Sequence, residues 1–129
     1  MMLTDCSAAT RTADVARAQA SAPAPADPDL GTVMERFYGD VEGGHWAIAY
    51  AMLSPRYRRA LGRDEFVAQY ARFADIDASL RQSGARSLVA TLTTHDRADR
   101  NRVRRFVESW TLAWDGEGWV LDALRRREI

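Results

Sequence analysis

The sequence predicts an α+β fold in which three N-terminal helices pack on a curved four-stranded antiparallel sheet. Up to about residue 75, apolar residues repeat with the period of a helix. After residue 75 they occur at every second position, as on one face of a strand. A second observation is the segment from Arg104 to Leu124, where two alternating runs flank a turn that contains Gly116 and Gly118. This is the pattern of a β-hairpin. Helices followed by a strand meander indicate the α+β class, with the helices on one face of the sheet.

The composition excludes several classes of protein. With 129 residues and a formal net charge of zero, the chain is expected to form one domain and to bind no nucleic acid. The lone Cys6 excludes an internal disulfide, and one cysteine with two histidines is too few for the usual zinc site. No apolar run is long enough to cross a bilayer. We therefore expect no metal and no cofactor.

Residues 1–27 are expected to form a disordered tail or tether, and residues 28–129 the domain. Ala, Ser, Thr and Pro dominate the tail, and such a segment buries too little apolar surface to offset the entropy of ordering it. Within it, Leu3–Ala9 resembles the start of a mature bacterial lipoprotein, because Cys6 precedes small residues and an Ala/Pro linker. Two locations stay open: outside the cytoplasm with a lipid anchor on Cys6, if a signal peptide was trimmed, or the cytoplasm.

Three helices are predicted in the N-terminal half of the chain. The first begins near Pro28, with Asp27 as its cap, and ends at Gly43–Gly44. The second covers residues 45–53 and ends at Ser54–Pro55, because a proline disfavours helix in the preceding residue. The third follows Gly62. Their apolar faces are formed, helix by helix, by Leu30, Val33, Met34, Phe37, Tyr38 and Val41; by Trp46, Ala49, Tyr50 and Leu53; and by Phe66, Val67, Tyr70 and Phe73.

Four strands follow: residues 76–80, residues 87–95 and the two strands of the hairpin. Matching apolar residues across neighbouring strands predicts the register. It places Leu88, Ala90 and Leu92 opposite Trp110, Glu108 and Phe106, and it places Trp114, Leu112, Trp110 and Glu108 opposite Trp119, Leu121, Ala123 and Arg125. The inner face then carries Phe106, Trp110, Leu112, Trp114, Trp119 and Leu121. The outer face carries Val89, Thr91, Thr93, Val107, Ser109, Thr111, Ala113, Val120 and Leu124.

Glu108 is the one charged residue that this register places in the middle of the aromatic inner face, between Phe106 and Trp110. Burial would raise the pKa of its carboxyl, whereas pairing with Arg125 would hold that pKa down. One interpretation is an acid, base or ligand anchor inside a pocket. The other is a partly buried ion pair between Glu108 and Arg125 at the edge of the sheet.

Several segments together carry a family resemblance: Phe37-Tyr38, residues 41–46, 49–55 and 66–70, Trp110-Thr111-Leu112 and residues 118–122. They resemble the NTF2-like (cystatin-like α+β, ketosteroid-isomerase-like) superfamily over roughly residues 29–125, and are closest to its small bacterial domains on lipoproteins. The resemblance implies a cone in which the helices close one mouth of a bent sheet around a pocket. If that pocket lies on the predicted inner face, the residues expected to bind a ligand are Tyr38, Tyr50, Tyr70, Phe106, Glu108, Trp110 and Arg125.

Three functions stay open. The first is a non-catalytic domain that binds a small apolar or amphipathic molecule or a protein partner. The second is a small isomerase, dehydratase or cyclase that uses Glu108 and a tyrosine donor; enzymes of this kind need a carboxylate base that faces oxyanion donors. The third is a structural dimerisation module. The semi-apolar outer face of the sheet predicts a homodimer.

Overall fold

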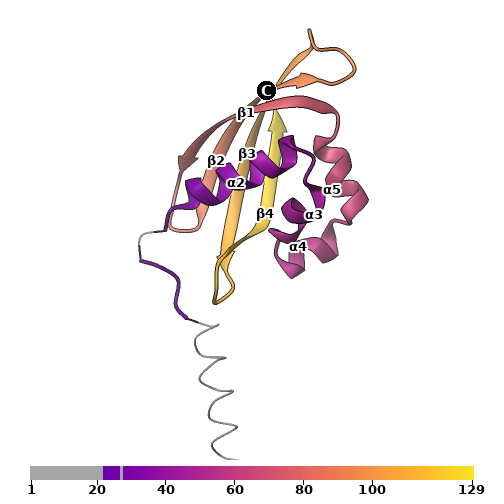
Figure 1. Ribbon diagram of the computed structural model, residues 1–129. Coiled ribbons are helices and arrows are strands. Elements are labelled where there is room, and N and C mark those ends of the chain that lie inside the picture. The colour runs from indigo at the N-terminus through magenta and orange to yellow at the C-terminus, as the bar shows by residue number, and fades with distance from the viewer. Residues whose placement is uncertain (1–21, 27) are drawn as a thin grey trace, which may run out of the picture.

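The computed structural model describes residues 22–26 and 28–129 and confirms the α+β class (Figure 1). In these residues one antiparallel sheet with the strand order β1-β2-β3-β4 follows the helices. The elements are α2 (Leu30–Glu42), α3 (Trp46–Ala51), α4 (Pro55–Ala60), α5 (Arg63–Tyr70), β1 (Phe73–Gln82), β2 (Ser87–Asp96), β3 (Val103–Trp114) and β4 (Trp119–Glu128). Most of the predicted tail, with Cys6, lies outside the described residues.

Helix α2 begins two residues later than the sequence predicted. Asp29, and not Asp27, is its cap: the Asp29 carboxylate accepts hydrogen bonds from the Thr32 amide at 3.1 Å and from the Thr32 hydroxyl at 2.7 Å. The helix ends at the predicted glycine pair, where Gly44 has a φ of +76°, a conformation that glycine adopts without steric cost. One side of α2 is buried, so the helix packs through the predicted apolar face: Leu30, Met34, Phe37, Tyr38 and Val41.

The described part of the chain has four helices, so the prediction of three was wrong. Ser54–Pro55 does end the region of α3, but it also begins α4. The Ser54 hydroxyl accepts a hydrogen bond from the Tyr57 amide at 3.1 Å, and Pro55 occupies the first turn. Ser followed by Pro is therefore both a stop for one helix and a start for the next. Phe73, expected on the third helix, instead begins β1.

The predicted register of β2 against β3 is confirmed, with Leu88, Ala90 and Leu92 opposite Trp110, Glu108 and Phe106. The even-numbered residues of β3 from Phe106 to Leu112 are buried and point toward the helices. In the β3–β4 hairpin, Trp114 lies opposite Trp119 and Leu112 opposite Leu121, also as predicted.

Beyond Leu121 the hairpin register shifts, and the prediction fails there. Thr111 pairs with Ala123 while Leu112 pairs with Leu121, so Asp122 is an extra residue in β4, as in a β-bulge. Glu108 therefore lies opposite Arg126, not Arg125, and Trp110 lies opposite Leu124, not Ala123. Leu124, expected on the outer face, packs against the core.

Contacts to α4 hold the bulge in place. The Asp122 carboxylate accepts hydrogen bonds from the Ser54 hydroxyl at 2.6 Å and from Arg56 at 2.8 Å. These two contacts, the one to Arg56 first, keep the pKa of Asp122 below its ordinary value. Asp122 therefore fastens the start of α4 to β4 and has a structural role.

The two edges of the sheet differ. At β4, Leu53 forms a parallel bridge with Leu121, with hydrogen bonds from the Ser54 amide to the Leu121 carbonyl (2.8 Å) and from the Leu121 amide to the Met52 carbonyl (2.9 Å). Figure 1 shows α3, α4 and α5 gathered beside this edge. At the other edge, β1 pairs with β2 alone among the described residues, and α2 crosses the sheet near it. The β1 edge is consequently the open one.

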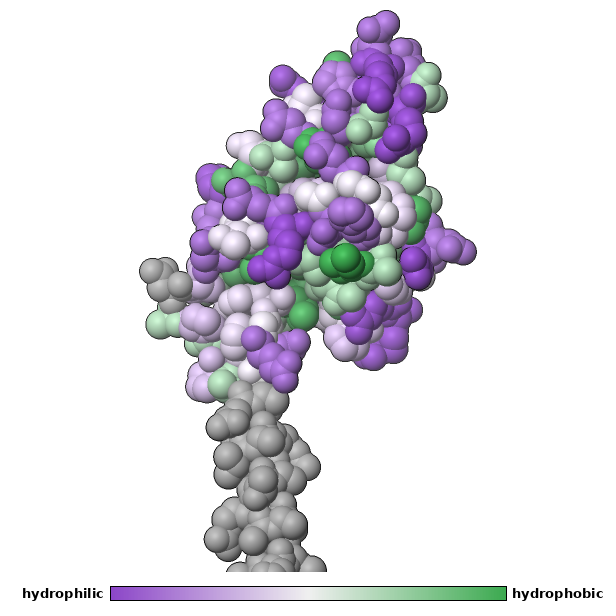
Figure 2. Space-filling view, in the orientation of Figure 1, coloured by the Kyte–Doolittle hydropathy of each residue, from purple (hydrophilic) through white to green (hydrophobic). Residues whose placement is uncertain are grey.

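The core lies between the inner face of the sheet and the helices. Its largest fully buried side chains are Trp110, Tyr70, Phe37, Phe66, Leu30, Met34, Leu53, Leu88, Leu92, Leu112, Leu121 and Glu108. On the side of the molecule that carries α2, small apolar areas lie between strongly hydrophilic ones (Figure 2). None of the helices in the described part of the chain has the length and hydropathy needed to cross a membrane.

Candidate functional site

The centre of the candidate site is the carboxylate of Glu108, whose residue is 0% exposed. The Tyr38 hydroxyl donates a hydrogen bond to Oε1 at 2.5 Å, and the Tyr70 hydroxyl lies 3.2 Å from Oε1 and 3.0 Å from Oε2. Trp110 Nε1 donates in turn to the Tyr38 hydroxyl at 2.9 Å. Four of the residues predicted from the sequence thus meet in one hydrogen-bonded cluster, which we call the Glu108 cluster: Tyr38, Tyr70, Glu108 and Trp110.

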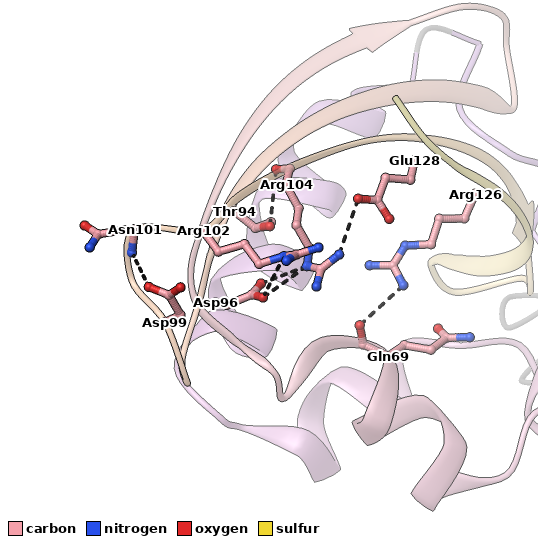
Figure 3. Close-up of polar contacts among 9 residues, drawn as sticks. All are labelled: Gln69, Thr94, Asp96, Asp99, Asn101, Arg102, Arg104, Arg126 and Glu128. Carbon is pink, nitrogen blue, oxygen red and sulfur yellow. Dashed lines mark hydrogen bonds and ion pairs between the residues drawn. The ribbon is translucent and has the colours of Figure 1, made fainter.

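Arg126 completes the cluster from β4. Its Nε lies 3.1 Å from Glu108 Oε2, which is ion-pair distance, but the N–H is not aligned for a hydrogen bond. Its guanidinium stacks over the Phe106 ring at 4.4 Å and over the Tyr70 ring at 5.1 Å. Figure 3 shows the same side chain directed toward Gln69 of α5, whose carbonyl accepts from Arg126 at 3.3 Å. Arg126 therefore neutralises the buried carboxylate and ties β4 to α5.

Burial dominates the electrostatics of the cluster. Desolvation raises the pKa of the Glu108 carboxyl, opposed by the hydrogen bond from Tyr38, the charge of Arg126 and the hydrogen bond from Tyr70. Burial first, and the Glu108 charge second, raise the pKa values of Tyr38 and Tyr70 well above that of free tyrosine. The same two causes raise the pKa of Tyr57 to about 12. All three tyrosines are therefore neutral at physiological pH, and Tyr38 and Tyr70 donate to Glu108 in that state.

A second group of charged side chains lies on the strands near Arg126 (Figure 3). Arg104 Nε lies 3.0 Å from Asp96 Oδ1, and Arg104 Nη1 lies 3.5 Å from Glu128. Arg102 also approaches Asp96, at 3.7 Å. Since each of these arginines faces a carboxylate, they form ion pairs along the sheet and not an anion site.

The other three predicted site residues take no part in the hydrogen bonds of the Glu108 cluster. The Tyr50 hydroxyl donates to the carbonyls of Arg58 and Leu61 at 3.1 and 2.9 Å, and so ties α3 to the end of α4. Arg125 is exposed and pairs with Ser109 across the hairpin, so the predicted Glu108–Arg125 ion pair is wrong. Phe106 contacts the site only as the surface beneath Arg126.

Sequence reasoning missed Arg126 as a site residue. The sequence does contain a signal for the extra residue that brings Arg126 opposite Glu108, because Leu121 and Leu124 are both apolar and are three residues apart. Strict alternation cannot place both on one face, whereas one extra residue between them can.

A groove of about 560 Å³ runs between α2 and β1. We call it the α2–β1 groove. It is lined by Asp29, Gly31, Thr32, Glu35, Tyr38, Gly39, Glu42, Ile76, Ala78 and Leu80. The strand contributes three apolar side chains, and the helix contributes positions that recur once per turn. Within residues 22–26 and 28–129, Glu108 lines neither this groove nor the two smaller cavities next to Trp110 and Arg72. The groove therefore lies beside the Glu108 cluster, and Tyr38 belongs to both.

The charged residues that line the α2–β1 groove are all acidic: Asp29, Glu35 and Glu42. Hydrogen bonds from Thr32 keep the pKa of the Asp29 carboxyl below its ordinary value. Glu42 Oε2 accepts a hydrogen bond from the Ile76 amide at 2.8 Å. The groove thus combines an apolar strand wall with an acidic rim, which suits an amphipathic ligand that carries positive charge.

The described residues contain no group of three or more His, Cys, Asp and Glu side chains placed to hold a metal ion. No protein-family model, no curated protein and no solved structure matches this chain.

Proposed function

We propose that this chain is a non-catalytic binding domain of the NTF2-like kind, which takes an apolar or amphipathic ligand into the α2–β1 groove. The observation that carries the proposal is the position of Tyr38. Tyr38 is one of the residues that line the groove, and its hydroxyl is fixed between Glu108 and Trp110. A groove wall held by two hydrogen bonds is preorganised, which lowers the entropy cost of binding. The apolar side chains of Ile76 and Ala78 supply the facing surface.

The same geometry argues for a supporting role of Glu108. A catalytic carboxylate must come within hydrogen-bond reach of the substrate. Glu108 is fully buried, and Tyr38, Tyr70 and Arg126 surround its oxygens. We infer that the carboxylate positions Tyr38 and does not contact a ligand.

A small isomerase or dehydratase is the second candidate, and one observation favours it. The Tyr38 hydroxyl lies 2.5 Å from the Glu108 carboxylate, and a short hydrogen bond to a buried carboxyl of raised pKa is a common feature of acid–base sites. For this function a substrate would have to displace Tyr38 or Arg126 from the carboxylate.

Homodimerisation through the outer sheet face remains a separate proposal. The corrected outer face loses Leu124 and keeps half-buried residues on three strands, among them Val89, Val107 and Val120. Val107→Glu would place a charge in the middle of that face. If the proposal is right, light scattering finds a dimer for the wild type and a monomer for the variant.

The binding proposal can be tested with decyltrimethylammonium, a cationic amphiphile, below its micellar concentration. In an amide-resolved NMR titration we expect shifts at Gly31, Gly39 and Ala78. Gly39 is the position at which to block the groove, because a Cβ built there meets no atom within 4 Å. Gly39→Phe should fill the space and weaken binding at least tenfold, and helix propensity should improve with the loss of glycine.

Ala47→Phe is the matched control, since Ala47 is an exposed position on α3 outside the groove. It should leave the titration unchanged. Equal affinity of the Gly39→Phe variant and the wild type would contradict the proposal. Shifts centred on Arg126 and Tyr57, with none in the groove, would favour the enzyme instead.

A further inference from the structure

We infer that the partner is an extended basic peptide, which adds to the open edge of β1 as a fifth strand along the α2–β1 groove. This inference rests on the proposed function, because it uses the same groove and names its occupant.

The backbone of β1 offers hydrogen-bonding groups to a partner. Within an antiparallel strand the amide and carbonyl of one residue point to the same edge, and successive residues alternate. The Ile76 amide donates to Glu42 of α2, so it points away from β2. Ala78 and Leu80, two and four residues further along the regular register, present their amides and carbonyls to that same edge. No strand of the described chain pairs there.

The opposite edge shows what a closed edge looks like in this fold. At β4, the bridge of Leu53 to Leu121 uses both backbone groups of Leu121. At β1, the carboxylate of Glu42 accepts from the Ile76 amide, and no strand of the described chain pairs with the outward amides of Ala78 and Leu80. An unpaired edge strand is a template for another strand, and addition of a peptide strand to such an edge is a common mode of recognition.

The side chains beside this edge favour an alternating peptide. Ile76, Ala78 and Leu80 point to the inner face, because they lie opposite Thr94, Leu92 and Ala90, which are buried. All three are only half-buried and line the groove. From Ile76 to Leu80 the strand extends about 13 Å, which matches four to five residues of an extended peptide. Every second side chain of that peptide would enter the groove.

The charge of the rim selects the peptide. The three charged residues that line the groove are carboxylates, so lysine or arginine at the ends of the peptide would meet opposite charge, and an acidic peptide would meet like charge. Of the three carboxylates, Glu35 is the best placed to pair with a basic side chain of the peptide, since it is exposed and accepts no hydrogen bond among those described.

The test uses the full chain and the acetylated, amidated peptide Lys-Val-Thr-Val-Thr-Val-Lys, with Glu-Val-Thr-Val-Thr-Val-Glu as its charge control. A third peptide has the lysine sequence with N-methyl groups on alternate backbone nitrogens, which removes the strand hydrogen bonds and keeps the side chains. We expect the lysine peptide to bind at least tenfold tighter than either of the others. Hydrogen exchange at the Ala78 and Leu80 amides should slow at least tenfold when it binds.

Variants of the protein locate the site. Gly39→Phe should weaken binding of the lysine peptide at least tenfold, Glu35→Gln two- to fivefold, and Ala47→Phe not at all. Equal binding of the N-methylated peptide would overturn strand addition. Concentration-dependent protection of Ala78 and Leu80 without any peptide would also overturn the inference, since a second copy of the chain would then cover the edge.

The amphiphile titration separates this inference from the proposed function. If decyltrimethylammonium shifts the groove amides and no peptide does, the groove binds ligands but is not a strand-addition site. If neither probe shifts them, both proposals fail.

Discussion

The Tyr38 hydroxyl and the Glu108 carboxylate, 70 residues apart in the sequence, lie 2.5 Å apart in the core. The hydrogen bond joins α2 to the middle of β3, and Trp110 adds a second bond to the same hydroxyl. Buried polar groups of this kind stabilise a fold only when each of them is satisfied. Glu108 meets that condition through hydrogen bonds from two tyrosines, and the charge of Arg126 lies beside it.

The stability of the protein should depend on pH through Glu108 in a direction opposite to that of most carboxylates. Burial raises the pKa of Glu108 above its ordinary value of 4.5 in the folded state. The folded protein then binds the proton more tightly than the unfolded chain, and the resulting stabilisation is fully present below about pH 4.5 and is lost as the pH rises through the raised pKa. Glu108→Gln keeps an acceptor for both tyrosines but cannot ionise.

We therefore expect the unfolding free energy of the wild type, minus that of Glu108→Gln, to fall as the pH rises from about 4 to 8. Urea denaturation of both proteins across that range measures the difference, and groups that titrate equally in both cancel. A difference that grows with pH would show that Arg126 and the tyrosines outweigh desolvation.

The two tyrosines should contribute unequally. Tyr38→Phe leaves the Trp110 indole N–H without a partner and leaves Glu108 Oε1 only the longer contact to Tyr70 at 3.2 Å, whereas Tyr70→Phe removes one donor from a carboxylate that keeps Tyr38. A buried group left unsatisfied costs about 1–3 kcal/mol. We expect Tyr38→Phe to lower the unfolding free energy by more than Tyr70→Phe does, as measured by urea denaturation at pH 7. The reverse order would mean that Tyr70 is the main anchor of Glu108.

Much of the fold was predictable because it depends on simple apolar matching. The register of β2 against β3 followed from pairing Leu88 with Trp110 and Leu92 with Phe106, and it placed Glu108 inside correctly. A one-residue slip would have moved that whole apolar set to the other face, so the pattern specifies the register strongly.

The parts that could not be predicted depend on single polar residues and on how elements sit in space. Ser54 and Arg56 bind the carboxylate of Asp122 and so hold Asp122 in the bulge. Both residues belong to the start of α4, a helix that was not predicted because Ser54–Pro55 was interpreted only as the end of the preceding helix. The α2–β1 groove depends on the position of α2 over the sheet, which no periodicity in the sequence encodes. The open edge of β1 likewise becomes visible only once the order of the strands is known.

The bulge can be tested through the two neighbouring arginines. Arg126→Met removes the counter-ion of a fully buried carboxylate, and breaking a buried pair in this way costs about 3–5 kcal/mol. Arg125→Met changes an exposed side chain on the outer face, where substitutions usually stay within about 0.5 kcal/mol. Urea denaturation at pH 7 compares the two. If the larger loss belonged to Arg125, the hairpin would have no bulge and the regular register would be right.

Asp122 should give a pH dependence of the ordinary sign, opposite to that of Glu108. Hydrogen bonding and the charge of Arg56, together with the Ser54 hydroxyl, lower the pKa of Asp122 below its ordinary value of 3.8. The unfolded chain then binds the proton more tightly, so the stabilisation is present above about pH 4 and is lost as the pH falls. Asp122→Asn keeps an acceptor for Ser54 but has no charge for Arg56. The unfolding free energy of the wild type should therefore exceed that of the variant at pH 7 and approach it toward pH 3, whereas a constant difference would show that the Asp122 charge does not fasten α4 to the bulge.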